Sequence, residues 1–398
     1  GEALEQRINL ASFSLTGSGG TGTATLTLAA NESLTILANT SSSYTFTLAS
    51  GSWTGTAANG ISASGTVLTA NSTALSTYGT FAITKASATA GSSVTFANSG
   101  TTNTFKDNFT VTLTGTGTAG TVTFNGTSSF ASGSALTVST NRNVVFASGS
   151  QLLSVNGNIA IDANPTTAAA AVYDGISLTG ATIKSTGSGN ITLSGKGGAG
   201  ANTAETNRGI NIVSSSLIQT GSGSITLTGN AGLYNGTGDF CIAGINLDTS
   251  DILSTSGNIS LTGTGSSTGT ATVGDCDGVN LEIASDIVTG STGSVSIIGT
   301  AFRNGEGVDI QDNTNNTVFA GSGGLTIEGY AANSVGVEVK GPANTTTVLK
   351  AGSGAISIKG ISDTNDALNL SDLLIGDGTV TNLTITATGG SVTASGDD

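Results

Sequence analysis

The chain of 398 residues contains no histidine or methionine, 2 prolines, 2 cysteines, and 11 lysines and arginines against 25 aspartates and glutamates. Its formal net charge of −14 argues against a nucleic-acid partner, because phosphate binding requires clustered cations. No run of about 18 apolar residues is present, so we expect no transmembrane segment. The lack of Met and of a basic, apolar leader at Gly1 predicts a processed form or an excerpt of a longer chain.

Charged residues are also scarce, at 9% of the chain, whereas 36% of the residues are hydrophobic and 60 residues are glycine. Disordered segments combine low hydrophobicity with high net charge. Here the apolar residues alternate with polar ones, as in Ile191-Thr-Leu193, which is typical of β-strands. We therefore predict a folded, all-β protein.

One pattern recurs seven times between residue 175 and the C-terminus. A small residue is followed by an apolar-x-apolar triplet, a polar gap, an apolar pair, a Gly/Ser turn and a second triplet. Successive copies begin 29 to 35 residues apart, which indicates a solenoid, a propeller or a stacked array. The opening triplets are Ile176-Ser-Leu178, Ile210-Asn-Ile212, Ile245-Asn-Leu247, Val279-Asn-Leu281, Val308-Asp-Ile310, Val337-Glu-Val339 and Leu368-Asn-Leu370.

Each copy contains three short strands. Propeller blades place four strands in about 40 to 45 residues, so three strands in roughly 30 residues fit one coil of a parallel β-helix. We predict a right-handed, three-sided parallel β-helix (β-solenoid) with seven coils over residues 175–398 and shorter coils over 105–174. Residues 1–104 are predicted to be a less regular all-β region, either further coils or a sandwich, with residues 1–15 as a candidate inter-subunit arm.

The end of the last coil, near Val392, has no recognisable polar or helical cap in the sequence. A single coil cannot fold alone, because it relies on strand pairing and core contacts shared with its neighbours. An open strand edge can template pairing with another chain, which predicts self-association into a filament. The alternative is that a loop, or the rest of a longer chain, covers this end.

Cys241 and Cys276 precede the openings of adjacent copies and are expected at nearly the same corner of adjacent coils. The spacing between coils, about 4.8 Å, falls within the Cα separation of a disulfide. Such a bridge would imply an oxidising compartment. Two buried free thiols are the alternative.

Asp251 and Asp286 occupy matching positions on the second strand of adjacent coils. Two carboxylates this close repel each other unless a cation intervenes, so a Ca²⁺ site is conceivable, with two solvated acids as the alternative. We expect no other metal or cofactor. The first strand stacks Asn211, Asn246 and Asn280, whose amides can hydrogen-bond along the solenoid.

Three long segments, at residues 194–209, 228–244 and 262–278, are expected to protrude on one side, where solenoids commonly place binding sites. They are candidates for binding a glycan or a surface. Polysaccharide-cleaving β-helix enzymes use paired acids or clustered basic groups, and no such set is evident here, so we expect no enzymatic activity.

The phrases Gly157-Asn-Ile-Ala-Ile161, Gly189-Asn-Ile-Thr-Leu-Ser-Gly195 and Gly257-Asn-Ile-Ser-Leu-Thr-Gly263 resemble those of giant secreted bacterial surface proteins of the filamentous-haemagglutinin type. The resemblance covers residues 105 to 390 and implies an extracellular or cell-surface fibre, stalk or adhesin. The expected role is a subunit of a cell-surface fibre built by end-to-end stacking of solenoids. The alternatives are a segment of a long adhesin and, less favoured, a polysaccharide-degrading enzyme.

Overall fold

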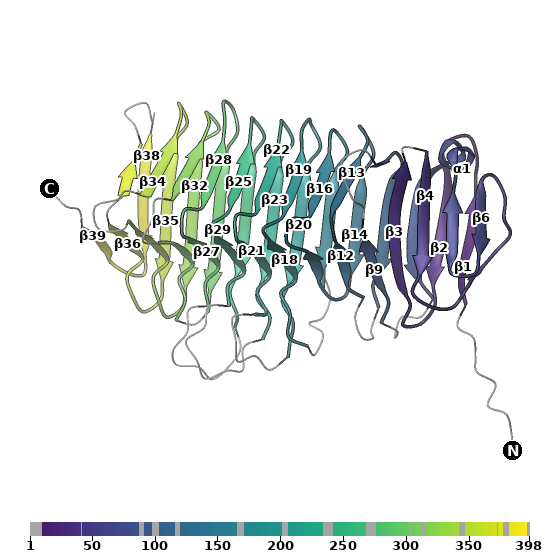
Figure 1. Cartoon of the computed structure of the whole chain (residues 1–398). Helices are drawn as coiled ribbons and strands as arrows, with labels where there is room; N and C mark the ends of the chain where they lie inside the picture. The colour runs from purple at the N-terminus through teal and green to yellow at the C-terminus, as the bar shows by residue number, and fades with distance from the viewer. Residues whose placement is uncertain are drawn as a thin grey trace, which may run out of the picture.

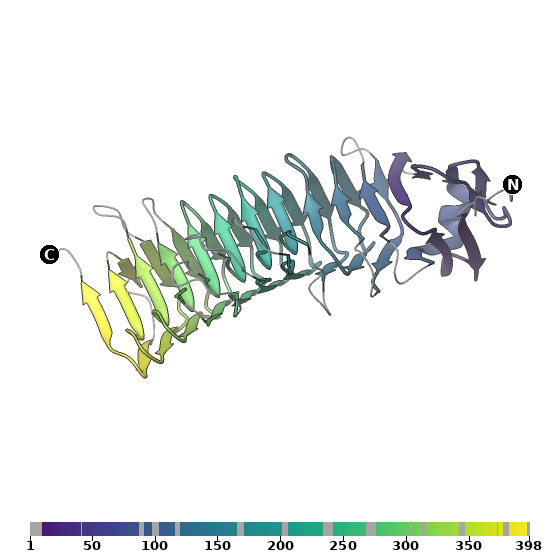
Figure 2. The same ribbon diagram turned by 90° about the horizontal axis from the view of Figure 1, so that it is seen from below.

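The chain forms an elongated rod, with the strands lying across its long axis, β1 and β6 near one end and β38 and β39 near the other (Figure 1). Figure 2 shows that the successive strands rotate gradually along the rod. The computed structural model describes residues 10–40, 42–86, 91–97, 103–115, 120–164, 171–200, 206–233, 242–267, 276–302, 304–311, 316–341, 347–371, 373–376 and 382–395.

Three sheets run along the rod, with 14, 15 and 10 strands over the described residues; we call them sheets A, B and C. Sheet A contains, in spatial order, β5 (Trp53–Thr54), β1 (Ala11–Thr16), β2 (Gly22–Leu28), β8 (Tyr78–Lys85), β11 (Asn108–Leu113), β14 (Leu136–Thr140), β17 (Ile159–Ala163), β20 (Ile191–Lys196), β23 (Ile225–Asn230), β26 (Ile259–Thr264), β29 (Val295–Ala301), β32 (Leu325–Ala331), β35 (Ile356–Ser362) and β38 (Leu383–Thr388).

Sheet B contains β6 (Ile61–Ser64), β7 (Val67–Ala70), β4 (Ser43–Leu48), β3 (Ser33–Thr40), β9 (Ser93–Phe96), β12 (Val122–Phe124), β15 (Val144–Phe146), β18 (Ile176–Thr179), β21 (Ile210–Val213), β24 (Ile245–Asp248), β27 (Val279–Glu282), β30 (Val308–Gln311), β33 (Val337–Lys340), β36 (Leu368–Ser371) and β39 (Val392–Ser395). Sheet C contains β10 (Thr104–Phe105), β13 (Thr127–Phe130), β16 (Gln151–Ser154), β19 (Thr182–Ser185), β22 (Leu217–Thr220), β25 (Asp251–Ser254), β28 (Asp286–Thr289), β31 (Thr317–Ala320), β34 (Thr347–Ala351) and β37 (Leu373–Ile375).

From β9 onward each coil contributes one strand to sheet B, then one to sheet C, then one to sheet A, and every strand pairs in parallel with its counterpart in the next coil. Ile225 of β23, for example, pairs with Ile259 of β26, which pairs with Val295 of β29. The all-β solenoid predicted from the repeat is confirmed. Its handedness and the three domain boundaries stay predictions.

The alternation of the sequence explains the core. Ile225 and Leu227 of β23 point inward and are 1% and 0% exposed, while Thr226 between them points outward. Each fully buried aliphatic side chain contributes about 1.5 to 3 kcal/mol, and the same positions repeat from coil to coil. The core is therefore one continuous stack of apolar side chains along the rod.

The small residue that opens each copy lies where sheets A and B converge. A Cβ atom added to Gly278 would lie 2.2 Å from the backbone nitrogen of Thr300 on β29, and one added to Gly307 would lie 2.4 Å from that of Tyr330 on β32. No side chain fits between these backbones. The glycine of the repeat is thus required by a close approach of two sheets.

The polar gap between sheets B and C is also explained by contacts between coils. The backbone N–H of Ser216 donates to Ser250 Oγ at 3.1 Å, that of Ser250 donates to Ser285 Oγ at 3.3 Å, and that of Ser285 donates to Asn316 Oδ1 at 2.9 Å. All four of these side chains are buried. Buried backbone groups at the turn are thereby satisfied by the neighbouring coil.

The first 86 residues continue sheets A and B and then close the end of the rod. β2 and β3 pair in parallel with β8 and β9, whereas the hairpins β1–β2, β3–β4 and β6–β7 are antiparallel. A short helix, α1 (Ser72–Thr77), follows Asn71, whose Oδ1 accepts from the backbone N–H groups of Thr73 and Ala74. Of the two arrangements that the sequence left open for this region, the structure shows continuation of the solenoid sheets.

Candidate functional site

The C-terminal end of the rod exposes the hydrophobic core. Leu383 and Ile385 of β38 pair in register with Ile356 and Ile358 of β35. The earlier pair is 1% and 0% exposed, whereas Leu383 and Ile385 are 48% and 43% exposed. Val392 of β39, also at this end, is 50% exposed. Among the described residues, nothing covers the inward row of the last coil.

The N-terminal end is closed. Trp53 on β5 and Ile61 on β6, the outermost strands there, are 7% and 3% exposed, and Phe13 on the neighbouring β1 is 6% exposed. The Trp53 indole N–H donates to the Phe46 carbonyl oxygen at 3.2 Å, which fixes the ring across the end. The two ends of the rod therefore differ: one is sealed by hairpins, and the other presents apolar side chains and strand edges.

The described part of the proposed inter-subunit arm is engaged within the chain. β1 pairs along its length with β2, and its first residues, Ala11 and Ser12, pair with β5 on the other side. Residues 1–9 lie outside the described residues. An inter-subunit arm over residues 1–15 stays a prediction.

The outward face of sheet B carries the predicted ladder of amides. Asn246 Nδ2 donates to Asn211 Oδ1 at 3.1 Å, and Asn280 Nδ2 donates to Asn246 Oδ1 at 3.2 Å. Asn246 and Asn280 are nevertheless only 3% and 2% exposed. Strands β24, β27, β30 and β33 of sheet B are thus buried on both faces, a feature that the sequence pattern did not indicate.

Acidic side chains continue this covered face. Asp309 and Glu338 follow Asn280 in the same row, in register on β30 and β33, and are 1% and 5% exposed. Oxygen atoms of Asp277, Glu306 and Asp309 all lie within 4.8 Å of one another. The sequence analysis did not predict this cluster. Asp277 and Glu306 come directly before the opening glycines of successive copies, and the fold brings these positions together at one corner of the solenoid.

Asp251 and Asp286, the predicted metal ligands, lie in register on β25 and β28. Burial, and secondarily the charge of Asp286, raise the pKa of Asp251. Asp286 Oδ1 accepts the backbone N–H of Thr317 at 3.0 Å. The two side chains are half-buried, and no third metal-ligating side chain joins them among the described residues. Metal binding by this pair stays a prediction.

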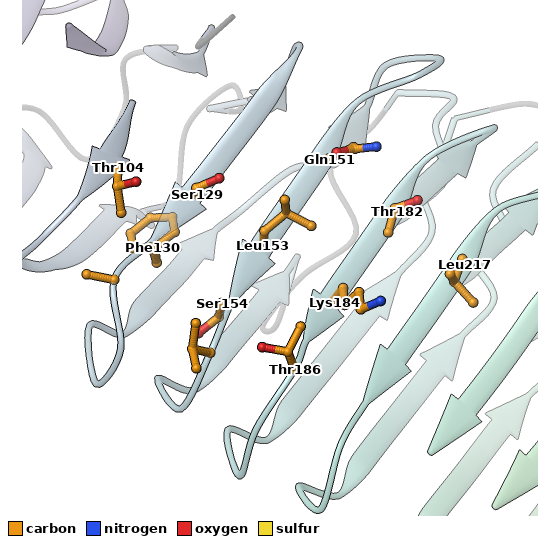
Figure 3. Close-up of a pocket in the computed structure, with 12 residues that line it drawn as sticks. Thr104, Ser129, Phe130, Gln151, Leu153, Ser154, Thr182, Lys184, Thr186 and Leu217 are labelled. Atoms are coloured by element: carbon orange, nitrogen blue, oxygen red, sulfur yellow. The ribbon is translucent and has the colours of Figure 1, made fainter. Parts of the chain in front are cut away.

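Sheet C bears a shallow groove of about 670 Å³ on its outer face, across β10 to β22 (Figure 3). Leu153 and Leu217 contribute apolar surface, Gln151 and Thr182 contribute polar groups, and Lys184 is the one charged residue that lines it. The volume is sufficient for a small ligand. Because no carboxylate lines the groove, it holds no acid pair of the kind that cleaves glycosidic bonds.

The predicted disulfide and the predicted loops fall partly outside the described residues. Cys241 is not described, and Cys276 is buried at 1% exposure. Within the three long segments predicted to bind a ligand, the parts outside the described residues are 201–205, 234–241 and 268–275. Their described stems stack on one another: the Leu233 backbone N–H donates to the Gly198 carbonyl oxygen at 3.0 Å. The disulfide and loop-mediated binding stay predictions.

No family of known proteins, no curated protein and no solved structure matches this chain. The solenoid architecture is consistent with β-helix repeat proteins, and the resemblance to filamentous-haemagglutinin-type proteins is not established beyond that level. In the part of the chain that the structure describes, no helix is long and apolar enough to cross a membrane.

Proposed function

We propose that this chain is an extracellular structural rod at the cell surface, joined to a second copy through its C-terminal coil. The observation that carries the proposal is the exposure of Leu383, Ile385 and Val392 at positions whose counterparts in the preceding coil are buried. An apolar surface with unpaired strand edges favours association with a matching edge. A second copy offers such an edge.

The closed N-terminal end bears on the geometry of the assembly. Continuous head-to-tail stacking would require a matching apolar surface at the N-terminal end, but the side chains of Phe13, Trp53 and Ile61 are already buried within the chain. Tail-to-tail contact of two C-terminal coils is isologous and closes after two copies. We therefore favour pairs of rods over an unlimited filament, which the sequence alone had suggested.

The test is the oligomeric state of the purified chain, measured by analytical ultracentrifugation and electron microscopy. The parent protein is expected to form dimers with twice the length of one rod. A variant with Leu383→Lys and Ile385→Lys is expected to be monomeric. Ile298→Lys is the matched control, because Ile298 is 37% exposed on sheet A away from the ends. Monomers of the parent protein at high concentration would overturn end-to-end assembly.

The cell-surface part of the proposal rests on the resemblance and on the low content of charged residues, and it needs a separate test. An antibody against the rod is expected to label intact source cells. Labelling only after the cells are permeabilised would contradict an exterior location, whatever the oligomeric state.

A further inference from the structure

Sheet C forms an apolar outer face of the rod. From β22 to β34, each of its five successive strands turns one large apolar side chain outward. On the neighbouring strands of sheet A the outward positions carry Thr and Ser instead, as Thr226 and Ser260 do. A continuous apolar strip of this kind favours a protein partner. The residues of the strip are Leu217, Leu253, Val288, Phe319 and Val348, all half-buried.

The other half of the same face is hollow. The groove of about 670 Å³ extends over β10 to β22, with Leu153, Lys184 and Leu217 on three of the strands that form it (Figure 3). Val155, which also lines the groove, is 41% exposed. Sheet C therefore presents a hollow toward the N-terminal end and the apolar strip toward the C-terminal end. A second copy turned end for end would place its strip over this hollow.

Opposite charges are separated on this face. Lys184 on β19 makes no hydrogen bond or ion pair within the described part of the chain. Asp251 lies on β25, two coils further along the rod, where it is in register with Asp286. Two coil spacings of about 4.8 Å separate Lys184 from Asp251 by roughly 10 Å along the rod, too far for an ion pair. Burial and the charge of Asp286 raise the pKa of Asp251, so a cation brought close to it would favour its ionised form.

We propose that sheet C binds sheet C of a second, antiparallel copy about a two-fold axis at Leu217. Rotation about an axis that runs along β22 exchanges the strands on either side of β22. Lys184, one coil before β22, then faces β25 of the second copy, where Asp251 lies two residues, or about 6.6 Å, from the facing position and within reach of the flexible lysine. Leu153, two coils before β22, faces Val288, two coils after it. Such an interface is isologous, so each of these contacts occurs twice.

The charges select the antiparallel arrangement. A two-fold axis along the rod would place each strand over the same strand of the second copy. Lys184 would then face Thr182, and Asp251 would face Leu253, so no opposite charges would meet. The antiparallel arrangement brings Lys184 to Asp251 twice and covers the groove with the apolar strip. It is therefore the arrangement in which charge and shape both match.

The contact is small. From β13 to β31 the overlap covers six coil spacings of about 4.8 Å and strands of four residues at about 3.3 Å each, or roughly 400 Å² on each copy. Interfaces that bury less than about 1,200 Å² in total are weak and transient. The contact therefore leaves the oligomeric state of dilute rods unchanged and acts where rods are crowded at a surface. Because it uses no residue of the C-terminal coil, it does not depend on end-to-end joining, and it can connect end-joined pairs side by side.

Cysteine cross-linking detects a weak contact and reports its register. Leu217→Cys is placed in the variant with Leu383→Lys and Ile385→Lys, whose ends cannot join, and is oxidised with diamide. EDTA is present, so that no metal ion occupies the acid pair. The two copies of the new thiol meet at the axis, and we expect a covalent dimer on a non-reducing gel. Thr226→Cys in the same background, outward on sheet A, is the matched control and is expected to stay monomeric. The native cysteines are present in both proteins, so the control also measures their contribution.

A second pair of cysteines tests the arrangement of the two copies. Leu153→Cys alone should stay monomeric, because its two copies would lie four coils, or about 19 Å, apart. Leu153→Cys combined with Val288→Cys should form a covalent dimer, because these two positions face each other across the interface. Circular dichroism of each variant, matched to the parent protein, excludes unfolding as the source of any difference.

Exchange of the charges tests the ion pair. In the Leu217→Cys protein, Lys184→Glu should slow cross-linking about tenfold. Addition of Asp251→Lys should restore the rate, because the two charges are then exchanged. Cross-linking of Leu217→Cys no faster than that of Thr226→Cys would overturn the proposal, as would a charge exchange that fails to restore the rate. Neither result bears on end-to-end joining, which is measured by ultracentrifugation of the parent protein.

Discussion

The hydroxyl group of Tyr44 donates a hydrogen bond of 2.6 Å to Asp107 Oδ2 inside the core, across 63 residues of sequence. The backbone N–H of Lys106 donates to the same hydroxyl at 2.6 Å. Tyr44 is 0% exposed and Asp107 is 7% exposed. This contact ties β4, in the antiparallel closure of the rod, to the segment between β10 and β11, where the three-strand coils begin.

Asp107 makes stability dependent on pH. Burial raises the pKa of its carboxyl group to about 6 from 3.8, although the Tyr44 hydrogen bond and the Lys106 charge oppose the shift. The folded state thus binds the proton more tightly. Asp107 therefore adds about 3 kcal/mol to the free energy of unfolding below about pH 4, and this contribution is lost as the pH rises through 6. In urea unfolding between pH 4 and 7, Asp107→Asn should remove this part of the pH dependence.

The comparison with the parent protein is essential for this prediction, because burial also raises the pKa of Asp174 and Asp309. The carboxyl groups of these two residues also lower the stability of the fold as the pH rises, and they remain in the Asp107→Asn variant. An unchanged pH dependence in Asp107→Asn would show that Asp107 is ionised normally in the folded protein.

Gly263→Ala is expected to destabilise the corner between sheets A and B. The new methyl group would meet the Gly278 carbonyl oxygen at 1.9 Å, so the two backbones must separate. Overpacking of this kind costs about 1 to 3 kcal/mol. Gly352→Ala is the control, because its nearest neighbour would lie at 3.6 Å. Chemical unfolding of both variants checks the difference, and equal stability would contradict the close approach.

Repetition is what made most of the fold predictable. Val279 and Val308 were assigned to successive opening strands from spacing alone, and they pair in register on β27 and β30. The repeat constrains every coil at once, because each inward position must match the one above it. The N-terminal closure has no such repeat. Its antiparallel hairpins, such as β6 with β7, depend on contacts that occur once, and the sequence pattern therefore left the region open.

The candidate sites were less predictable for a related reason. Strand alternation marks Asn246 and Asp309 as outward, which normally means solvated, yet they are 3% and 1% exposed. Alternation predicts which side of a strand a residue lies on, but it carries no information about what packs against that side. Ile385 could be placed in the last copy of the repeat from the sequence, and it is 43% exposed.

Asn246→Ala should break the ladder of amides in two places. The change removes the donor to Asn211 Oδ1 and the acceptor of Asn280 Nδ2, both in a buried row. A buried polar group left without its partner costs about 1 to 3 kcal/mol. Amide hydrogen exchange should increase in β21, β24 and β27 before it increases in distant coils. Asn333→Ala, at an exposed position, should leave exchange in these strands unchanged.

Phe124→Ala is expected to be the most destabilising of these changes. The Phe124 ring is stacked between Phe96 and Phe146, with centroid distances of 5.0 and 4.6 Å and interplanar angles of 8° and 9°. All three rings are buried, so the substitution leaves a cavity in the core. Such changes cost about 3 to 5 kcal/mol. Phe302→Ala, at a position 41% exposed, should change stability by less than about 0.5 kcal/mol. Because each coil depends on both neighbours, the loss at Phe124 should also lower protection from hydrogen exchange in β9 and β15, and a purely local effect would contradict coupling between coils.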